Sequence, residues 1–133
     1  MREIEISIGE ISFKATLLED KAPKGSEALW KALPIKAEAH HGGLAGTEIY
    51  FNLMKPYAKL EQENPYLLSE LKPGDLSTMG GGFAIFYGEV GPEPYPENVV
   101  ARVEKEEELL KLKKAGYRVW YQPGDRILIK KVE

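Results

Sequence analysis

Residues 72–88, KPGDLSTMGGGFAIFYG, constrain the fold of this chain more than any other segment. Pro73-Gly74-Asp75 has the composition of a β-turn, and the run from Phe83 to Tyr87 is apolar at every position, which is typical of a strand covered on both faces. The glycines at 80–82 are followed by no Lys-Ser/Thr pair and no helix, which excludes a phosphate-binding P-loop. The segment predicts a turn, a glycine loop and a buried strand, and it contributes no catalytic group.

The composition limits the class of protein. With 133 residues, the chain is expected to form a single domain over 1–133. It has no cysteine, which excludes thiol catalysis, cysteine-based zinc sites and disulfides and favours a cytoplasmic location. A net charge of -3, with no long apolar run, predicts neither a nucleic-acid nor a membrane partner. The abundance of Lys and Glu is typical of thermostable proteins.

Hydrophobic periodicity and turn residues predict a mainly β fold. The expected strands are 3–8, 11–18, 35–41, 47–53, 76–79, 83–87, 99–103 and 126–132. Two amphipathic helices are expected over 23–33 and 104–115. Residues 54–72 are expected to form a long surface loop, and 88–98 an extended connector because it holds three prolines.

Three local features support these boundaries. Gly9 at the first central position of a two-residue turn suits a type II′ hairpin between the first two strands. Pro23 fits the first turn of a helix, where its missing N–H costs nothing. Gly116 is placed to end the second helix in a left-handed conformation. Eight strands that pair across nearly every connection predict a closed or nearly closed β-barrel with a helix over each opening.

Several segments resemble cyclophilins, in the same order along the chain. FKATLLEDKAPKGSEALWKAL at 13–33 resembles their first helix with its preceding strand, and LSTMGGGFAIF at 76–86 resembles a later loop and strand. The combination of Ala39-His40-His41, Glu63-Asn64-Pro65 and Pro73-Gly74-Asp75 is similar to small prokaryotic cyclophilin-like proteins of uncharacterised function. The resemblance implies a closed eight-stranded antiparallel barrel with a filled interior, two helices capping its ends, and a binding groove on the outer surface.

Cyclophilins are peptidyl-prolyl isomerases, but this chain lacks their catalytic residues. The family arginine would fall within 48–53, EIYFNL, which contains none, and the tryptophan and histidine of a later loop would fall within 88–98, which contains neither. Efficient isomerase activity is therefore not expected. The sequence favours a non-catalytic binding module whose groove accepts a peptide or small ligand. The alternative is an isomerase with atypical donors, for instance Asn52.

The groove that the resemblance implies would use one set of candidate ligand-binding residues: Tyr50, Phe51, Asn52, Phe83, His40 and His41. Adjacent residues of a strand point to opposite faces, so the two histidines are not expected to ligate one metal ion, and no metal or cofactor is predicted. Trp120, beside two tyrosines, suits core packing, a surface groove or an oligomer contact equally. The acidic run at 104–108 is expected to be a solvated helix face.

Overall fold

A computed structural model describes residues 1–42, 46–90 and 96–133. Ten strands and two α-helices make up most of these residues. The strands are β1 (Glu3–Ile8), β2 (Ile11–Leu17), β3 (Ile35–Glu38), β4 (His40–Gly42), β5 (Gly46–Asn52), β6 (Pro65–Leu67), β7 (Asp75–Met79), β8 (Gly82–Val90), β9 (Pro96–Arg102) and β10 (Arg126–Lys131). The helices are α1 (Pro23–Ala32) and α2 (Glu106–Tyr121), with the short 3₁₀ helices η1 (Tyr57–Lys59) and η2 (Leu68–Glu70).

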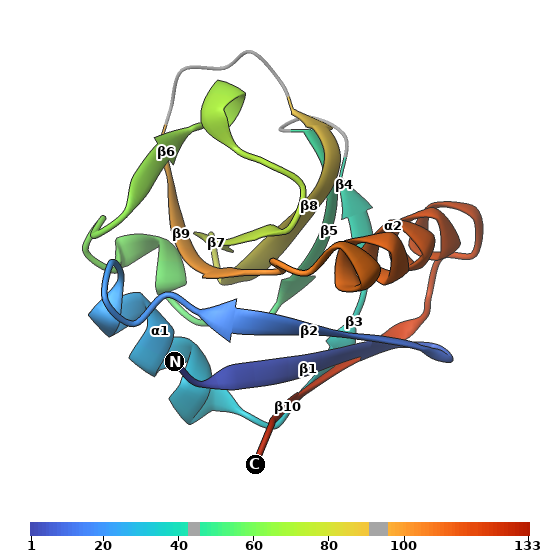
Figure 1. Cartoon of the computed structure of the whole chain (residues 1–133), viewed down its shortest axis with the longest axis horizontal. Coiled ribbons are helices and arrows are strands. Elements are labelled where there is room, and N and C mark those ends of the chain that lie inside the picture. The colour runs from blue at the N-terminus through green and yellow to red at the C-terminus, as the bar shows by residue number, and fades with distance from the viewer. Residues whose placement is uncertain (43–45, 91–95) are drawn as a thin grey trace.

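The strands form one antiparallel sheet that nearly closes into a barrel (Figure 1). Its order is β3-β10-β1-β2-β9-β7-β8-β5-β4, and β6 pairs separately with β9. The two ends of this order, β3 and β4, are separated in the chain only by Ala39, whose N–H donates to the carbonyl of Asp125 at 2.9 Å. One stretch of chain thus borders both β10 and β5, and this crossing brings the ends of the sheet together.

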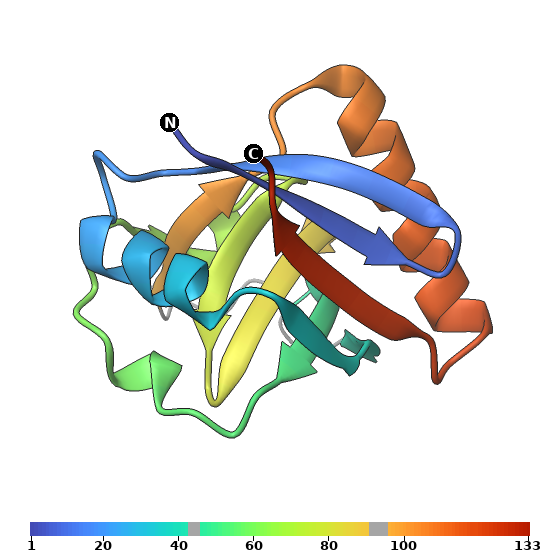
Figure 2. The same cartoon turned by 90° about the horizontal axis from the view of Figure 1, so that it is seen from below.

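The mainly β barrel with two helices is confirmed, but it has ten strands instead of eight. The predicted strand at 35–41 is divided because its halves pair with different partners, β10 and β5. The segment 54–72 contains β6, η1 and η2 instead of an irregular loop throughout. Figure 2 shows α1 and α2 on opposite sides of the barrel.

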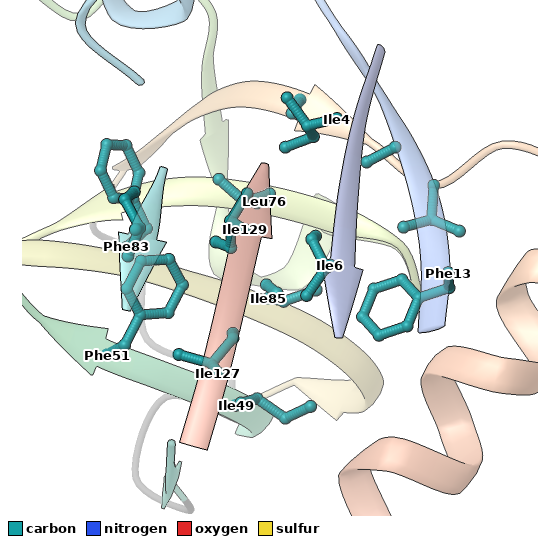
Figure 3. Close-up of a cluster of buried hydrophobic side chains, with 14 of the residues drawn as sticks. Ile4, Ile6, Phe13, Ile49, Phe51, Leu76, Phe83, Ile85, Ile127 and Ile129 are labelled. Atoms are coloured by element: carbon teal, nitrogen blue, oxygen red, sulfur yellow. The ribbon is translucent and has the colours of Figure 1, made fainter. Parts of the chain in front are cut away.

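The barrel interior is filled by side chains (Figure 3). Alternate residues of β1 and β2 point inward, and Ile4, Ile6 and Phe13 are at most 1% exposed. Ile129 from β10 and Phe83 from β8 meet them in the same cluster. An interior packed in this way has no room for a ligand, so a binding site must lie on the outside of the barrel.

The turns agree with their sequence signatures. Gly9 has a φ of +59°, as a type II′ turn requires at its first central position, and it joins β1 to β2. The glycines of the two Pro-Gly-Asp turns, Gly74 and Gly124, both have a φ of +102°, the region that the third residue of a type II turn occupies.

Helix α1 begins at Pro23, as predicted, and residues of the predicted loop cap it. The carboxylate of Glu63 accepts hydrogen bonds from the backbone N–H groups of Lys24 at 3.0 Å and Gly25 at 2.9 Å. The next residue, Asn64, donates to the carbonyl of Val99 at 3.0 Å. The Glu63-Asn64-Pro65 motif therefore joins α1 to β9, and its role in this chain is structural.

Helix α2 is longer than predicted, and Gly116 lies inside it instead of at its end. The buried residues Leu112, Ala115, Gly116 and Val119 follow helical spacing on one face. A Cβ on Gly116 would lie 2.4 Å from the ring of Tyr87 on β8. Glycine is thus required for the close approach of α2 to the barrel, and the prediction of a left-handed cap was wrong.

We expect Gly116→Ala to destabilise the protein. In a solvated helix the same change would stabilise by about 0.5–1 kcal/mol, because alanine is the better helix former. Here the methyl group overlaps a buried ring, and overpacking of this kind costs about 1–3 kcal/mol, so the net effect should be a loss. Urea denaturation measures it, with exposed Lys114→Ala as a control in the same helix. Stabilisation by Gly116→Ala would contradict this packing.

Strand β8 is covered on both faces, as its apolar run predicted. Phe83 and Ile85 point into the barrel, whereas Ala84 and Phe86 belong to a second buried cluster on the outside. The strand continues to Val90, beyond the predicted start of the connector, and β9 begins at Pro96. Pro92 and Pro94 of that connector lie outside the described residues. Within the described part of the chain, neither helix is long and apolar enough to cross a membrane.

Candidate functional site

The outer side of β4, β5, β8, β7 and β9 carries a row of residues in register. His40 pairs with Tyr50, Tyr50 with Ala84, Ala84 with Ser77, and Ser77 with Val99. Because residues opposite one another in a sheet point to the same face, this row crosses five strands on one side of the barrel wall. We call this surface the Glu48 face, after the carboxylate beside it. In Figure 1, β9, β7, β8 and β5 curve around it.

Glu48 is the unusual residue of this face. It lies opposite Phe86 on β8 and Gly42 on β4, and its side chain is only 4% exposed. Its Oε2 atom is buried and has no hydrogen-bond partner among the described residues. A Cβ on Gly42 would lie 2.4 Å from Oε1, so glycine at this position makes space for the carboxylate. A buried carboxylate oxygen that accepts no hydrogen bond destabilises the folded protein. Such an atom is therefore a candidate for a hydrogen bond from a ligand.

A second carboxylate, that of Glu97 on β9, lies close enough to Glu48 for its charge to act on the Glu48 carboxyl group. The Ser77 hydroxyl donates a hydrogen bond to Glu97 Oε2 at 3.2 Å. Burial raises the pKa of Glu48 to about 7, and the negative charge of Glu97 adds to the rise. Burial also raises the pKa of Glu97, although the hydrogen bond from Ser77 opposes this. Near neutral pH Glu48 is therefore partly protonated, and it can accept or release a proton.

Apolar side chains surround the two carboxyl groups. The second buried cluster contains Leu18, Leu68, Leu71, Ala84, Phe86 and Val99. Tyr50, Tyr66, Met79 and Val90 are partly buried against it. A few polar groups within an apolar, aromatic surface are typical of sites for small molecules.

The structure divides the predicted site residues between four places. His40 and Tyr50 lie together on the Glu48 face, where their rings are stacked with centroids 5.2 Å apart. Phe51 and Phe83 are fully buried in the barrel interior, with centroids 5.8 Å apart, so they do not line an outer surface. Their position follows from strand alternation, because Phe51 is the neighbour of Tyr50 and must point to the opposite face.

Asn52 lies near the far end of β5, where its Oδ1 accepts a hydrogen bond from the N–H of Met54 at 2.8 Å. A Cβ on Gly81 would lie 2.5 Å from the same oxygen. These contacts are those of a turn-stabilising asparagine. Nothing in them favours a role for Asn52 as a donor to a prolyl nitrogen.

His41 points away from the Glu48 face, as predicted for neighbours on a strand, and belongs to an aromatic cluster under α2. Its Nε2 is hydrogen-bonded to the hydroxyl of Tyr87, and its ring centroid lies 4.3 Å from that of Trp120. Burial lowers the pKa of His41, which favours the neutral imidazole. His41 therefore packs on the opposite side of the wall from His40. Among the described residues, no group of three or more His, Cys, Asp or Glu could hold a metal ion.

A groove of about 790 Å³ runs beside this cluster, between the end of β8 and α2. Tyr87, Leu109, Lys113, Tyr117 and Trp120 are among its lining residues. Trp120 is 54% exposed and Tyr117 46%, so the two rings are partly open to solvent. Of the predictions made for Trp120, the surface groove agrees with this position.

Sequence reasoning missed Glu48, Ser77 and Glu97. Glu48 alternates with apolar neighbours, as any solvent-facing strand residue does. The sequence of one strand does not show whether its polar face is exposed to solvent or buried under a second layer of side chains. The only available signal was β8, whose apolar run implies that its outer side is covered.

Solved structures show which fold the chain shares. It is similar to McbB, solved in complex with tryptophan, with a TM-score of 0.84 and 23% identity over 96% of this chain and 44% of McbB. The chain thus spans less than half the length of McbB. It is also similar to the hypothetical protein AF2241 from Archaeoglobus fulgidus, with a TM-score of 0.67 and 23% identity over 98% of this chain and 95% of that protein. Both have cyclophilin-like folds, which agrees with the fold implied by the resemblance.

No curated protein sequence matches the chain. A family model does match it over residues 4–127, which include every strand that contributes to the Glu48 face. The chain therefore belongs to the family described as "Protein of unknown function (DUF3830)".

Proposed function

We propose that this protein is a binding module for a small molecule, and that the ligand lies on the Glu48 face. The observation that carries the proposal is the buried Oε2 of Glu48, which has no partner among the described residues. Leaving such an atom unsatisfied costs about 1–3 kcal/mol, more for a charged group. A ligand that supplies the missing donor would remove this cost and gain affinity from it.

The apolar cluster beside Glu48 indicates the rest of the ligand. Tyr50 and Tyr66 are only partly buried and offer aromatic surface next to the carboxylates. A molecule with a planar apolar body and one polar group would suit this arrangement. The complex of McbB with tryptophan supports the choice of indole compounds as first probes, because that protein has the same fold.

Titration with three indole probes, tryptamine, tryptophol and L-tryptophan, tests the proposal. We expect at least one of them to shift the NMR signals of Tyr50 and the Met79 methyl group in a saturable manner. Tyr50→Ala should weaken that binding about tenfold or more, since removal of an aromatic contact costs on the order of 1–3 kcal/mol. Tyr117→Ala, in the groove beside α2, serves as the matched control and should leave the affinity unchanged.

Two outcomes would contradict the proposal. Absence of binding by all three probes at millimolar concentration would remove the Glu48 face as a site for such molecules. Binding that depends on Tyr117 and not on Tyr50 would move the site to the groove beside α2. The isomerase alternative remains a prediction from the resemblance, and no contact of Asn52 favours it.

A further inference from the structure

We propose that the ligand of the Glu48 face is an organic amine in its ammonium form, and that the ammonium group displaces a proton held by Glu48. This inference rests on the proposed function. It adds the charge of the ligand and a linkage between binding and pH.

The first step is the hydrogen-bonding capacity of Glu48. An ionised carboxylate accepts hydrogen bonds and donates none, so its partner must carry N–H or O–H groups. Oε1 of Glu48 is packed toward Gly42, which leaves Oε2 as the atom without a partner in the described chain. An ammonium group offers three donors and a positive charge, and bonds of this charged type are about twice as strong as neutral ones.

The second step is the charge of the surroundings. Arg102 on β9 is the nearby cation, but its Nε donates to Asp75 Oδ1 at 2.6 Å, and the other oxygen of Asp75 accepts the N–H of Lys72 at 2.9 Å. Arg102 is thus paired with Asp75 and not with Glu48. Glu97 bonds to the Ser77 hydroxyl, which carries no charge.

None of the other titratable groups of the face forms an ion pair with Glu48 in the described part of the chain. His40 on β4 stacks on Tyr50, and Tyr66 on β6 lies under the guanidinium of Arg102, 5.8 Å from its ring centroid. Strand β8 presents the apolar Ala84 and Phe86. Within the described residues no ion pair reaches Glu48 or Glu97, so the carboxyl group of Glu48 lies in an apolar setting without a counter-charge.

The third step is the proton. Burial and the charge of Glu97 raise the pKa of Glu48 to about 7, so at pH 7 about half of the Glu48 carboxyl groups carry a proton. An alkylammonium group stays charged up to about pH 10. Near pH 7 the ligand cation and the proton therefore compete for the same carboxylate, and binding of one must release the other.

Tryptamine and tryptophol test this inference, because they share an indole ring and a two-carbon chain and differ in carrying an ammonium or a hydroxyl group. At pH 8 we expect tryptamine to bind at least tenfold more tightly than tryptophol. The affinity of tryptamine should fall about tenfold for each pH unit below the pKa of Glu48, whereas that of tryptophol should not change with pH. Calorimetry in phosphate and in Tris at pH 7 should detect release of about half a proton with tryptamine, and none at pH 9.

Variants locate the effect. Glu48→Gln should abolish the pH dependence and lower the affinity for tryptamine at least tenfold, while binding of tryptophol persists. Glu97→Gln should move the midpoint of the pH dependence to lower pH, because it removes the charge that raises the pKa of Glu48. Exposed Glu38→Gln on β3 is the matched control and should change neither probe.

Three results would overturn the inference. Equal, Tyr50-dependent binding of both probes at every pH would leave a binding face that does not select amines, so the proposed function would stand without this addition. Tight binding of tryptamine without proton release would show that the ammonium group displaces no proton from Glu48. Binding of Ca²⁺ alone, dependent on Glu48 and accompanied by no binding of tryptamine, would assign the carboxyl pair to a metal ion instead.

Discussion

Glu48→Gln should stabilise the protein by about 3 kcal/mol at pH 8 and have little effect at pH 4. Glu48 has a pKa of about 7 in the folded chain, against 4.5 for an ordinary glutamate. The folded state therefore binds a proton that the unfolded state releases between pH 4.5 and 7, and the free energy of unfolding falls as the pH rises through this window. Each unit of pKa difference corresponds to about 1.4 kcal/mol, which gives the expected size. Glutamine is neutral at every pH and avoids the loss.

Urea denaturation of both proteins at pH 4, 6 and 8 measures this effect. The difference between wild type and variant isolates the contribution of Glu48 from those of other titrating groups. One of these is His41, whose pKa is lowered by burial. Its unfolded form binds more protons than its folded form, so its contribution to the free energy of unfolding rises with pH, opposite to that of Glu48. Glu38→Gln, on the exposed side of β3, should give parallel curves with the wild type. If Glu48→Gln also ran parallel to the wild type, Glu48 would be ionised and solvated, and the amine proposal would lose its basis.

Phe83→Ala should lower the free energy of unfolding by about 3–5 kcal/mol, the range for removing a buried phenylalanine ring from a core. Phe83 is 0% exposed and contacts Phe51 and Tyr57, with ring centroids 5.8 and 4.6 Å away. The loss includes both the transfer of the ring and the cavity that remains, since the barrel wall cannot collapse freely around it.

The same variant distinguishes the buried position of Phe83 in the structure from the outer groove that the resemblance implied. A ring in an outer groove would cost little when removed, typically within about 0.5 kcal/mol for an exposed side chain. Tyr121→Ala is the control for an exposed ring, because Tyr121 is 78% exposed. A loss below about 1 kcal/mol for Phe83→Ala in urea denaturation would contradict the packing of Figure 3 and return Phe83 to the surface.

Strand β8 links the two experiments, because it is shared by the core and by the Glu48 face. Phe83 and Ile85 fill the barrel from one side of the strand, and Phe86 lies beside Glu48 on the other. Because β8 is covered on both faces, its side chains are held in place and so is the Glu48 carboxylate beside them. This packing favours a site that is formed before the ligand binds. Gly80 and Gly81, between β7 and β8, form a tight reversal with a positive φ of +49° at Gly80.

The predictions that failed share a physical cause. A left-handed cap at Gly116 was inferred from local chemistry, whereas the glycine serves a contact with Tyr87 from a distant strand. The segment 54–72 looked irregular because no local pattern shows that Glu63 caps α1 or that residues 65–67 pair with β9. In each case the deciding partner lies far away in the sequence, where periodicity and turn composition carry no information.

Alternation and turn chemistry are local, and they were enough by themselves to determine the hairpin at Gly9, the opposite orientation of the two histidines and a mainly β barrel with two helices. Only the tertiary structure decided what lies on the outer side of the wall. It brought Glu48 near Glu97 across four strands, covered both with apolar side chains and left one oxygen without a partner. The environment of a carboxylate is set by strand order and layer packing, and these depend on the whole chain.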